Sequence, residues 1–274
     1  MKKSENGFYW KNSFPAARNA VYDLLFPPRC ILCDDLMEQG QGQIHPNCRN
    51  KLFPVSGAVC LHCGRPVVSE KYEFCYDCAR KEENHRKKED TFLQGKSLYL
   101  YKGQIKQTMY RFKYSNKREY AAYFAERTME SYGDWLEKID VDAVIPVPMY
   151  KRKERKRGYN QAAEFARGLV GTMEHDRSAG QKKRKGSGKI PVYDAGVIHR
   201  IKNTRPMKEL DDVERKNNLR NAFQVTENIV KYKKVLLVDD IYTTGSTADA
   251  VSRELLEAGV SEVFFLSICI GKGV

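Results

Sequence analysis

From about residue 91 onward, short apolar runs that suit buried strands alternate along the chain with segments of helical pattern. The runs expected to form strands are 97–102, 143–148, 233–238 and 263–268. The segments expected to form helices are 104–113, 117–137, 159–173 and 245–258, and Gly259 is expected to close the last of them. Because strands that alternate with helices form βαβ units, this pattern predicts an α/β fold built on a parallel sheet.

Two polar segments interrupt the pattern. Residues 79–90, ARKEENHRKKED, are highly charged and are predicted to form a linker at the main domain boundary. Residues 176–189 are rich in Gly, Ser and Lys and are predicted to form a mobile loop. Seven of the eight cysteines lie before the linker, whereas Cys269 lies in an apolar strand and is expected to be a core residue.

Composition narrows the class of protein. With 41% hydrophobic residues, 16 Tyr and 12 Phe, the chain has enough apolar side chains for a packed core, which argues against wholesale disorder. No apolar stretch approaches the ~20 residues that a membrane-spanning helix needs, and the N-terminal segment lacks the apolar block of a secretory signal. We therefore expect a cytoplasmic protein whose thiols stay reduced. The net charge of +13 favours an anionic partner such as nucleic acid, a nucleotide or a phosphorylated metabolite.

The N-terminal cysteines and one histidine form a ladder of four ligand pairs. The pairs CILC (30–33), HPNC (45–48), CLHC (60–63) and CYDC (75–78) each begin 15 residues after the previous one, with His45 in the place of a cysteine. Two ligands separated by two residues can reach one ion from a tight turn, and four such ligands complete the closed tetrahedral site of a structural zinc. Such ligation would also stabilise a segment too short to fold on its own core.

The ladder predicts two structural Zn²⁺ sites. The preferred pairing joins neighbours, so that one site consists of Cys30, Cys33, His45 and Cys48, and the other of Cys60, Cys63, Cys75 and Cys78. An interleaved arrangement, in which the first and third pairs share one ion, stays open. No open coordination position is implied, so the metals are expected to be structural.

A second chemical signature follows the strand expected at 233–238. Asp239 and Asp240 come at its end, and a turn then opens a helix with Thr243, Thr244, Gly245, Ser246 and Thr247. Gly245 allows a tight turn and a close approach of a ligand, while the exposed amides and hydroxyls form a cradle for an anion. Two acids beside such a site make sense if they hold hydroxyls, such as those of a ribose. The alternative without a ligand is an ordinary capped helix after a strand.

This segment resembles the fingerprint of type I phosphoribosyltransferases, which bind 5-phosphoribosyl-1-pyrophosphate (PRPP). In that family the two acids contact the ribose hydroxyls, and the turn after them holds the 5-phosphate. The resemblance implies that Asp239 and Asp240 are the catalytic pair, that residues 243–247 bind the phosphate, and that Mg²⁺ accompanies PRPP. It also implies a type I phosphoribosyltransferase-like parallel sheet with helices on both faces.

From about residue 20 to the end, the chain resembles the ComF/ComFC family, in which a double zinc ribbon precedes a phosphoribosyltransferase-type domain. The resemblance rests on LLFPPRCILC (24–33), on PVPMYKRKERKRGYNQAAEFA (146–166) and on the TTGST turn, and a further similar segment leads to Lys113. It implies an extension over 1–24, a double zinc ribbon over 25–80, a linker over 81–92 and a phosphoribosyltransferase-like domain over 93–274. The family is tied to natural competence, and its members are expected to act with a helicase-like partner.

The most basic segment, KRKERKR (151–157), follows the strand expected at 143–148 and ends at Gly158. In a phosphoribosyltransferase fold the loop after that strand lies near the pyrophosphate, so the segment is expected to be a loop in which Arg157 and Gly158 contact that group. The earlier basic residues, and a second cluster at 182–185, could face a longer polyanion. The tyrosines that could stack on the bases of single-stranded DNA are Tyr110, Tyr114 and Tyr159. The alternative is a solvated positive face with tyrosines in the core.

Three functions are compatible with the sequence. The first is a ComFC-like competence protein that handles single-stranded DNA during natural transformation and keeps a site for PRPP or a related sugar phosphate. The second is a phosphoribosyltransferase that transfers phosphoribosyl from PRPP to an unknown acceptor. The third is a zinc-ribbon adaptor whose PRPP-type fold only binds a partner protein.

Overall fold

The computed structural model describes residues 27–38, 42–83, 91–178, 189–203, 219, 221–226 and 231–271. The predicted extension over 1–24, the basic cluster at 182–185 and most of the predicted linker lie outside these residues. The chain divides into two compact units, 1–51 and 52–274, so the division runs between the two predicted metal groups. The domain limits implied by the family resemblance remain predictions.

The first unit is a small ribbon. Its described part contains an antiparallel bridge between Arg29 and Leu36 and the one-turn helix α2 (Pro46–Arg49). The backbone N–H of Asp34 donates to the carbonyl of Cys30 over 2.9 Å, and the N–H of Cys30 donates to the carbonyl of Asp35 over 2.9 Å. These hydrogen bonds form the tight turn that carries the first ligand pair.

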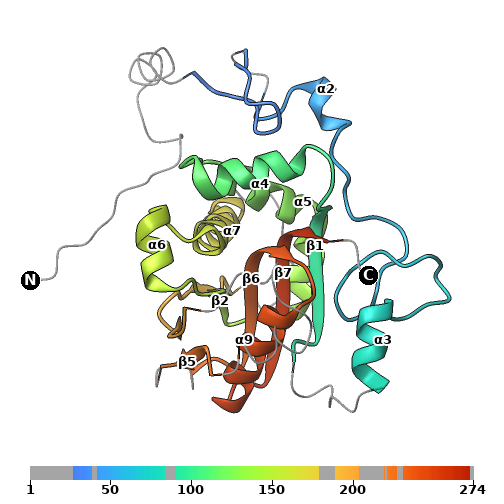
Figure 1. The fold of residues 1–274 in the computed structure, drawn as a ribbon, viewed down its shortest axis with the longest axis vertical. Coiled ribbons are helices and arrows are strands. Elements are labelled where there is room, and N and C mark those ends of the chain that lie inside the picture. The colour runs from blue at the N-terminus through green and yellow to red at the C-terminus, as the bar shows by residue number, and fades with distance from the viewer. Residues whose placement is uncertain are drawn as a thin grey trace, which may run out of the picture. The chain divides into compact units, whose positions relative to one another are not determined.

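The second unit is built on a five-stranded sheet whose described strand pairs are all parallel (Figure 1). Its strands lie in the order β1 (Gln94–Leu100), β7 (Glu262–Ile270), β6 (Lys234–Tyr242), β2 (Ala143–Pro146) and β3 (Val192–Tyr193). The central strands β6 and β7 are almost continuously apolar, as expected when helices cover both faces of a parallel sheet. A separate antiparallel pair is formed by β4 (Ile198–Arg200) and β5 (Phe223–Val225).

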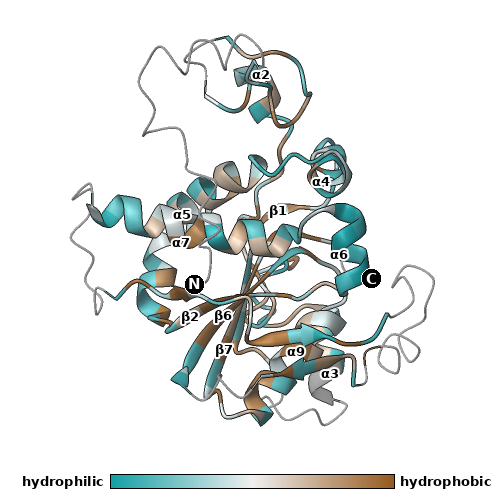
Figure 2. Ribbon diagram, turned by 90° about the vertical axis from the view of Figure 1, so that its left-hand side faces the viewer, coloured by the Kyte–Doolittle hydropathy of each residue, from teal (hydrophilic) through white to brown (hydrophobic). Residues whose placement is uncertain are grey.

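Helices cover both faces of the sheet. The helices of this unit include α3 (Tyr76–Glu83), α4 (Ile105–Tyr114), α5 (Tyr120–Ile139), α6 (Lys151–Arg157), α7 (Gln161–Ser178) and α9 (Ser246–Glu257). The long helices α5 and α7 pack on one face, against β1, β2 and β6, whereas α9 packs on the other, against β6 and β7 (Figure 2). The expected fold is therefore confirmed: a type I phosphoribosyltransferase-like parallel sheet follows a cysteine-rich N-terminal region in the sequence.

The core on the α9 side extends into the second cysteine-rich ribbon. Ile145 of β2 and Leu237 of β6 pack there with Leu255 of α9, and Cys60, Cys63, Cys75 and Cys78 belong to the same buried cluster. Residues 53–55 also pair with the outer edge of β1 through two backbone hydrogen bonds of 2.9 and 2.8 Å. The second ribbon is thus an integral part of the sheet unit.

Several elements differ from the expectation. Residues 151–157, expected as a basic loop, form helix α6, which Gly158 ends with a φ of 92°. Helix α7 continues to Ser178, into the segment expected to be a loop, and α3 extends to Glu83, into the predicted linker. The short strands β3, β4 and β5 were not predicted, because two or three residues carry too little periodicity to be recognised.

Within the described ranges, no helix is both long and apolar enough to cross a membrane.

Candidate functional site

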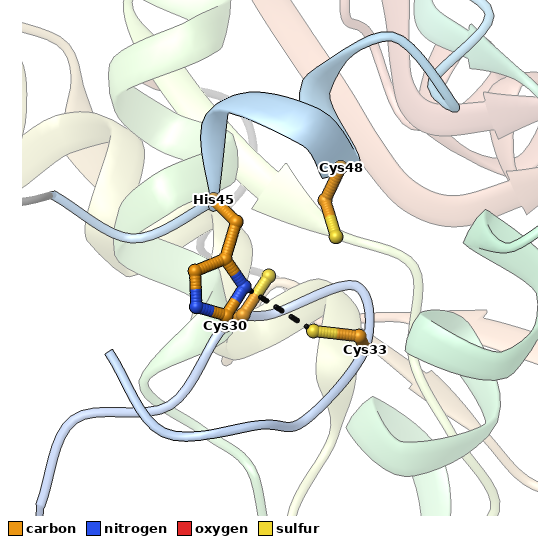
Figure 3. Close-up of side chains that lie close together, drawn as sticks. All are labelled: Cys30, Cys33, His45 and Cys48. Atoms are coloured by element: carbon orange, nitrogen blue, oxygen red, sulfur yellow. Dashed lines mark hydrogen bonds between the residues drawn. The ribbon is translucent and has the colours of Figure 1, made fainter. Parts of the chain in front are cut away.

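The first metal group brings together four ligand atoms that lie within 4.8 Å of one another, from Cys30, Cys33, His45 and Cys48 (Figure 3). His45 precedes the first residue of α2, so that its ring lies beside the cysteine pair of the preceding turn. Its Nε2–H donates to the carbonyl oxygen of Leu36 over 3.0 Å. This hydrogen bond leaves Nδ1, which lies 3.3 Å from Cys33 Sγ, as the atom that can bind a metal.

The second metal group is more deeply buried. Its four sulfur atoms also lie within 4.8 Å of one another and come from Cys60, Cys63, Cys75 and Cys78. Hydrogen bonding from Cys63 lowers the pKa of the Cys60 thiol, whereas hydrogen bonding to Cys60 raises the pKa of Cys78. Four adjacent buried thiols cannot all ionise without a cation between them, so this cluster suits a tetrahedral thiolate-bound metal.

Both groups join ligand pairs that are neighbours in the sequence, which is the preferred pairing of the sequence analysis. The interleaved alternative is not the arrangement that the described residues adopt. Cys269 is a member of neither group and lies in the buried strand β7, as expected of a core residue.

The acidic pair lies near the carboxyl end of β6. Asp239 Oδ1 accepts the backbone N–H of Asp240 over 2.8 Å, and Asp240 Oδ2 pairs with Lys113 Nζ of α4 over 2.8 Å. Burial, together with the neighbouring charge of Asp240, raises the pKa of Asp239 to about 7. Burial alone would lower the pKa of Lys113, but its pairing with Asp240 raises it above the ordinary value. The pair therefore combines one carboxyl that titrates near neutrality with one that is paired with a cation.

The turn after the acids begins helix α9. Gly245 adopts a φ of 81° at the helix N-cap, and its carbonyl accepts the backbone N–H of Asp249 over 2.8 Å. The hydroxyl oxygens of Thr244 and Ser246 lie 3.0 Å apart. The first-turn amides of this 12-residue helix and the two hydroxyls provide the donors that a phosphate group needs.

Positive side chains from three separate elements interact electrostatically with the acidic pair or with one another. They are Lys113 of α4, Arg157 of α6 and Arg200 of β4. The charge of Arg200 acts on Asp239, while the charge of Arg157 acts on Lys113. Arg200 is half-buried, and this burial lowers the pKa of its guanidinium. The arrangement combines acids with cations, as a ligand that carries both hydroxyls and phosphates requires.

The residues after Gly158 join α6 and α7 to the rest of this site. Tyr159 OH donates to the carbonyl of Phe112, and Gln161 Nε2 donates to the same carbonyl over 3.3 Å. Asn160 Nδ2 donates to the carbonyl of Val147, at the end of β2, over 2.9 Å. These bonds fix the end of α4 immediately before Lys113.

The prediction that Tyr159 stacks on bases is therefore wrong, because its side chain is 3% exposed and its hydroxyl is engaged with the backbone. Tyr110 and Tyr114, in contrast, are 62% and 61% exposed.

The sheet topology explains why these groups meet. After β2 the chain connects outward to β3, whereas after β6 it connects in the opposite direction to β7. Ligands of open α/β sheets bind at such a switch point, beyond the carboxyl ends of the two strands. The connections that begin there carry α6 after β2 and the Thr243–Thr247 turn after β6.

Some of these residues were predicted from the sequence, and others were not. Asp239 and Asp240 lie together, and Arg157 acts electrostatically on Lys113, the partner of Asp240. Gly158 ends α6, and its carbonyl accepts from Arg118 Nη2 over 2.8 Å. Lys113 was noted only through the family resemblance. Arg200 was missed because it lies in a three-residue strand that no sequence pattern marks.

Comparison with protein families identifies a double zinc ribbon domain over residues 21–79. This match and the two four-ligand groups together support two zinc sites. The match ends before the sheet, so it covers the metal-binding part only.

Comparison with known proteins extends the similarity to most of the chain. The chain is 27% identical to competence protein ComFC of Bacillus subtilis over 248 residues, which are 84% of this chain and 89% of that protein. It is 28% identical to competence protein F of Haemophilus influenzae over 248 residues, which are 86% of this chain and 93% of that protein. DNA utilization protein YhgH of Escherichia coli O6:H1 is 30% identical over 128 residues, which are 47% of this chain and 49% of that protein. Together with the double zinc ribbon, these similarities support the ComF family as the one that the chain resembles.

Proposed function

We propose that this protein handles single-stranded DNA in natural transformation and that it binds PRPP or a related sugar phosphate beyond the carboxyl ends of β2 and β6. The DNA-related role is supported by the names of its relatives, two of which are competence proteins and one a DNA utilization protein. The sugar-phosphate site is supported by one observation above all. Asp239 and Asp240, a helix N-terminus and cations from three elements come together at the topological switch point.

Each part of PRPP has a chemical counterpart among these groups. The two carboxylates can accept hydrogen bonds from ribose hydroxyls, and the amides and hydroxyls of residues 244–247 can hold the 5-phosphate. Lys113, Arg157 and Arg200 can face the pyrophosphate. Carboxylate oxygens are also the donors that Mg²⁺ prefers, and Mg²⁺ bound with PRPP would supply charge neutralisation between the pyrophosphate and the ribose.

The ion pair of Lys113 with Asp240 would keep these two charges balanced until a ligand arrives. A pyrophosphate could then attract Lys113, while Asp240 turns to a ribose hydroxyl. This exchange would let the site hold acids next to cations without leaving a half-buried charge unpaired.

The DNA-binding surface is proposed on α6 and the exposed tyrosines of α4. None of the seven residues of α6 is buried, and six of them are basic, so the whole helix is hydrophilic (Figure 2). The rings of Tyr110 and Tyr114 lie 4.9 Å apart, and the Arg157 guanidinium lies 5.0 Å above the Tyr114 ring. Exposed aromatic rings beside a basic surface are what proteins that bind single strands use for stacking and phosphate contact.

Calorimetry with PRPP and Mg²⁺ tests the ligand site. The unaltered protein is expected to bind, and Asp240→Asn is expected to weaken binding at least tenfold, while Asp134→Asn, an exposed acid of α5, changes nothing. Absence of binding by the unaltered protein would remove the sugar-phosphate part of the proposal.

The alternative function, a phosphoribosyltransferase, is favoured by the same acidic pair and turn. It predicts release of pyrophosphate from PRPP in the presence of an acceptor, with loss of this activity in Asp240→Asn. Binding without pyrophosphate release across a panel of bases and amines would leave a ligand-binding protein.

The binding of PRPP is expected to depend on pH through Asp239. Because its pKa is raised to about 7, this carboxyl is increasingly protonated below that pH and becomes a weaker acceptor for a ribose hydroxyl. Affinity should fall as pH drops from 8 to 6, approaching a factor of about ten per unit below the pKa.

Folding stability runs in the opposite direction, because a raised carboxyl pKa makes the free energy of unfolding decrease as pH rises from about 4 to 7.

Calorimetry across this range, with Asp239→Asn as control, separates the protein's titration from that of PRPP. A pH dependence that is the same in the variant would assign the effect to the ligand alone.

The DNA surface predicts a specific change in salt dependence. Neutralising two exposed residues of α6, Arg155→Gln and Lys156→Gln, should weaken single-stranded DNA binding and lower the slope of log affinity against log salt by roughly 0.7 per lost contact. The matched control neutralises Lys138 and Lys233, which are exposed just before β2 and β6, near the amino ends of those strands. Fluorescence anisotropy with a labelled oligonucleotide measures both. Equal slopes for the two double variants would contradict binding through α6.

A further inference from the structure

Arg65 joins the second metal group to the turn proposed to bind phosphate. It follows Cys63 and Gly64 in the ligand ladder, and its side chain is buried, with the residue 5% exposed. One terminal nitrogen, Nη1, donates to Asp77 Oδ2 and lies 4.0 Å from Cys75 Sγ. The other, Nη2, donates to the backbone carbonyl of Thr243. A single guanidinium thus bridges two segments that are 178 positions apart in the sequence.

The carbonyl that Arg65 holds determines the orientation of the next amide. The carbonyl of Thr243 and the N–H of Thr244 belong to one planar trans peptide, so they point in opposite directions. When the carbonyl is fixed toward the ribbon, the Thr244 N–H is turned away from it. This is the first amide of the segment Thr244–Thr247, whose donors would hold a phosphate.

The surroundings of Arg65 keep its charge in place. The guanidinium pairs with the carboxylate of Asp77, and the two side chains are only 6% and 23% exposed. The ring of Tyr242, the residue before Thr243, lies 6.0 Å from the guanidinium carbon. A zinc ion bound by four thiolates carries a net negative charge, which complements the guanidinium.

The second ribbon is held against the sheet by its own contacts, so the side chain of Arg65 extends from a fixed backbone position. The backbone N–H of Gly95 in β1 donates to the carbonyl of His62 over 2.6 Å, and the ring of His62 stacks on Phe92 with centroids 4.4 Å apart. These contacts fix the knuckle, which is the turn over residues 60–64 that carries the ligands Cys60 and Cys63 and precedes Arg65.

We propose that Arg65 is a positioning residue that makes sugar-phosphate binding depend on the second zinc site. With zinc on the four cysteines, Arg65 is held by Asp77 and orients the peptide between Thr243 and Thr244 for the anion. Without zinc, the knuckle and Arg65 lose their fixed position and the turn loses affinity for phosphate. This inference rests on the proposed function and adds to it a structural metal that controls the ligand site from outside.

The test compares Arg65→Ala and Arg65→Lys with Arg29→Ala in the full-length protein. Arg29 is the matched control, because its Nη1 also donates to a backbone carbonyl, that of Asp34, within the first unit. Zinc content is measured by elemental analysis, and binding of PRPP with Mg²⁺ by calorimetry. We expect two zinc ions per chain in all three variants. Affinity should be at least tenfold weaker in Arg65→Ala, intermediate in Arg65→Lys and unchanged in Arg29→Ala.

Two readouts separate positioning from a general loss of structure. Methylguanidinium, added at millimolar concentration, should restore part of the affinity of Arg65→Ala and leave the unaltered protein unaffected. Amide hydrogen exchange of residues 244–247 should accelerate at least tenfold in Arg65→Lys, while exchange in β6 stays unchanged.

The outcomes distinguish the two proposals. If the unaltered protein does not bind PRPP, the proposed function fails. If it binds, and Arg65→Lys shows both unchanged affinity and unchanged exchange at residues 244–247, the role of Arg65 is overturned while the proposed function stands.

Discussion

Replacement of Cys63 by serine is expected to unfold the sheet unit, whereas replacement of Cys33 by serine is expected to leave the melting temperature of that unit unchanged. Cys63 is buried in the core cluster that also holds Phe92, Leu237 and Phe265, so loss of its metal disrupts the packing of the sheet. Apparent binding free energies of structural zinc in small domains are about 10–16 kcal/mol. Since whole domains are stable by only about 5–15 kcal/mol, the sheet unit has too little stability to tolerate this loss.

The measurement is thermal unfolding followed by far-ultraviolet circular dichroism, together with zinc content. Both variants lose one ligand of one metal group, so each should retain the zinc of the other group if it stays folded. Cys33 lies in the compact unit 1–51, outside the unit that contains the sheet. Equal melting temperatures for the two variants would show that the second ribbon does not stabilise the sheet.

Replacement of Gly64 by alanine is expected to destabilise the second unit by several kcal/mol and to lower its affinity for zinc. Gly64 adopts a φ of 74°, where a side chain costs about 1–2 kcal/mol. In addition, a Cβ atom would lie 2.5 Å from the carbonyl oxygen of Gly95, which belongs to the backbone of β1 and cannot move away alone. The knuckle would have to separate from the strand, at a further cost of about 1–3 kcal/mol.

Gly57→Ala is the control for backbone strain. Gly57 has the same φ of 74°, but nothing lies within 4 Å of its Cβ position. This variant should lose only about 1–2 kcal/mol. Chemical denaturation of both variants measures the difference between them, which isolates the contact with Gly95. A difference near zero would mean that the knuckle does not need to lie against β1.

The elements that could be predicted from the sequence are those with a strong local signal. The strand before Asp239 is a continuous apolar run, and the helix after it begins at a glycine with hydroxyl residues on either side. The metal groups follow from a fixed spacing of 15 residues, because ligands on tight turns carry their geometry with them.

What could not be predicted depends on contacts between distant segments. Helix α6 has no apolar face, since six of its seven residues are basic, so no hydrophobic periodicity marks it as a helix. The hydrogen bonds of Tyr159 with Phe112 and of Arg65 with Thr243 join residues far apart in sequence, and neither arginine nor tyrosine indicates its partner. The same holds for Arg200, which reaches the acidic pair from a separate small sheet.

The pairing of residues 53–55 with β1 has a consequence for how molecules behave toward one another. Without this segment, β1 would present unpaired N–H and C=O groups along its outer side, because its only other described neighbour in the sheet is β7. Such open edges recruit strands from other chains and lead to aggregation. By covering this edge, the second ribbon is therefore also expected to prevent edge-to-edge association between molecules.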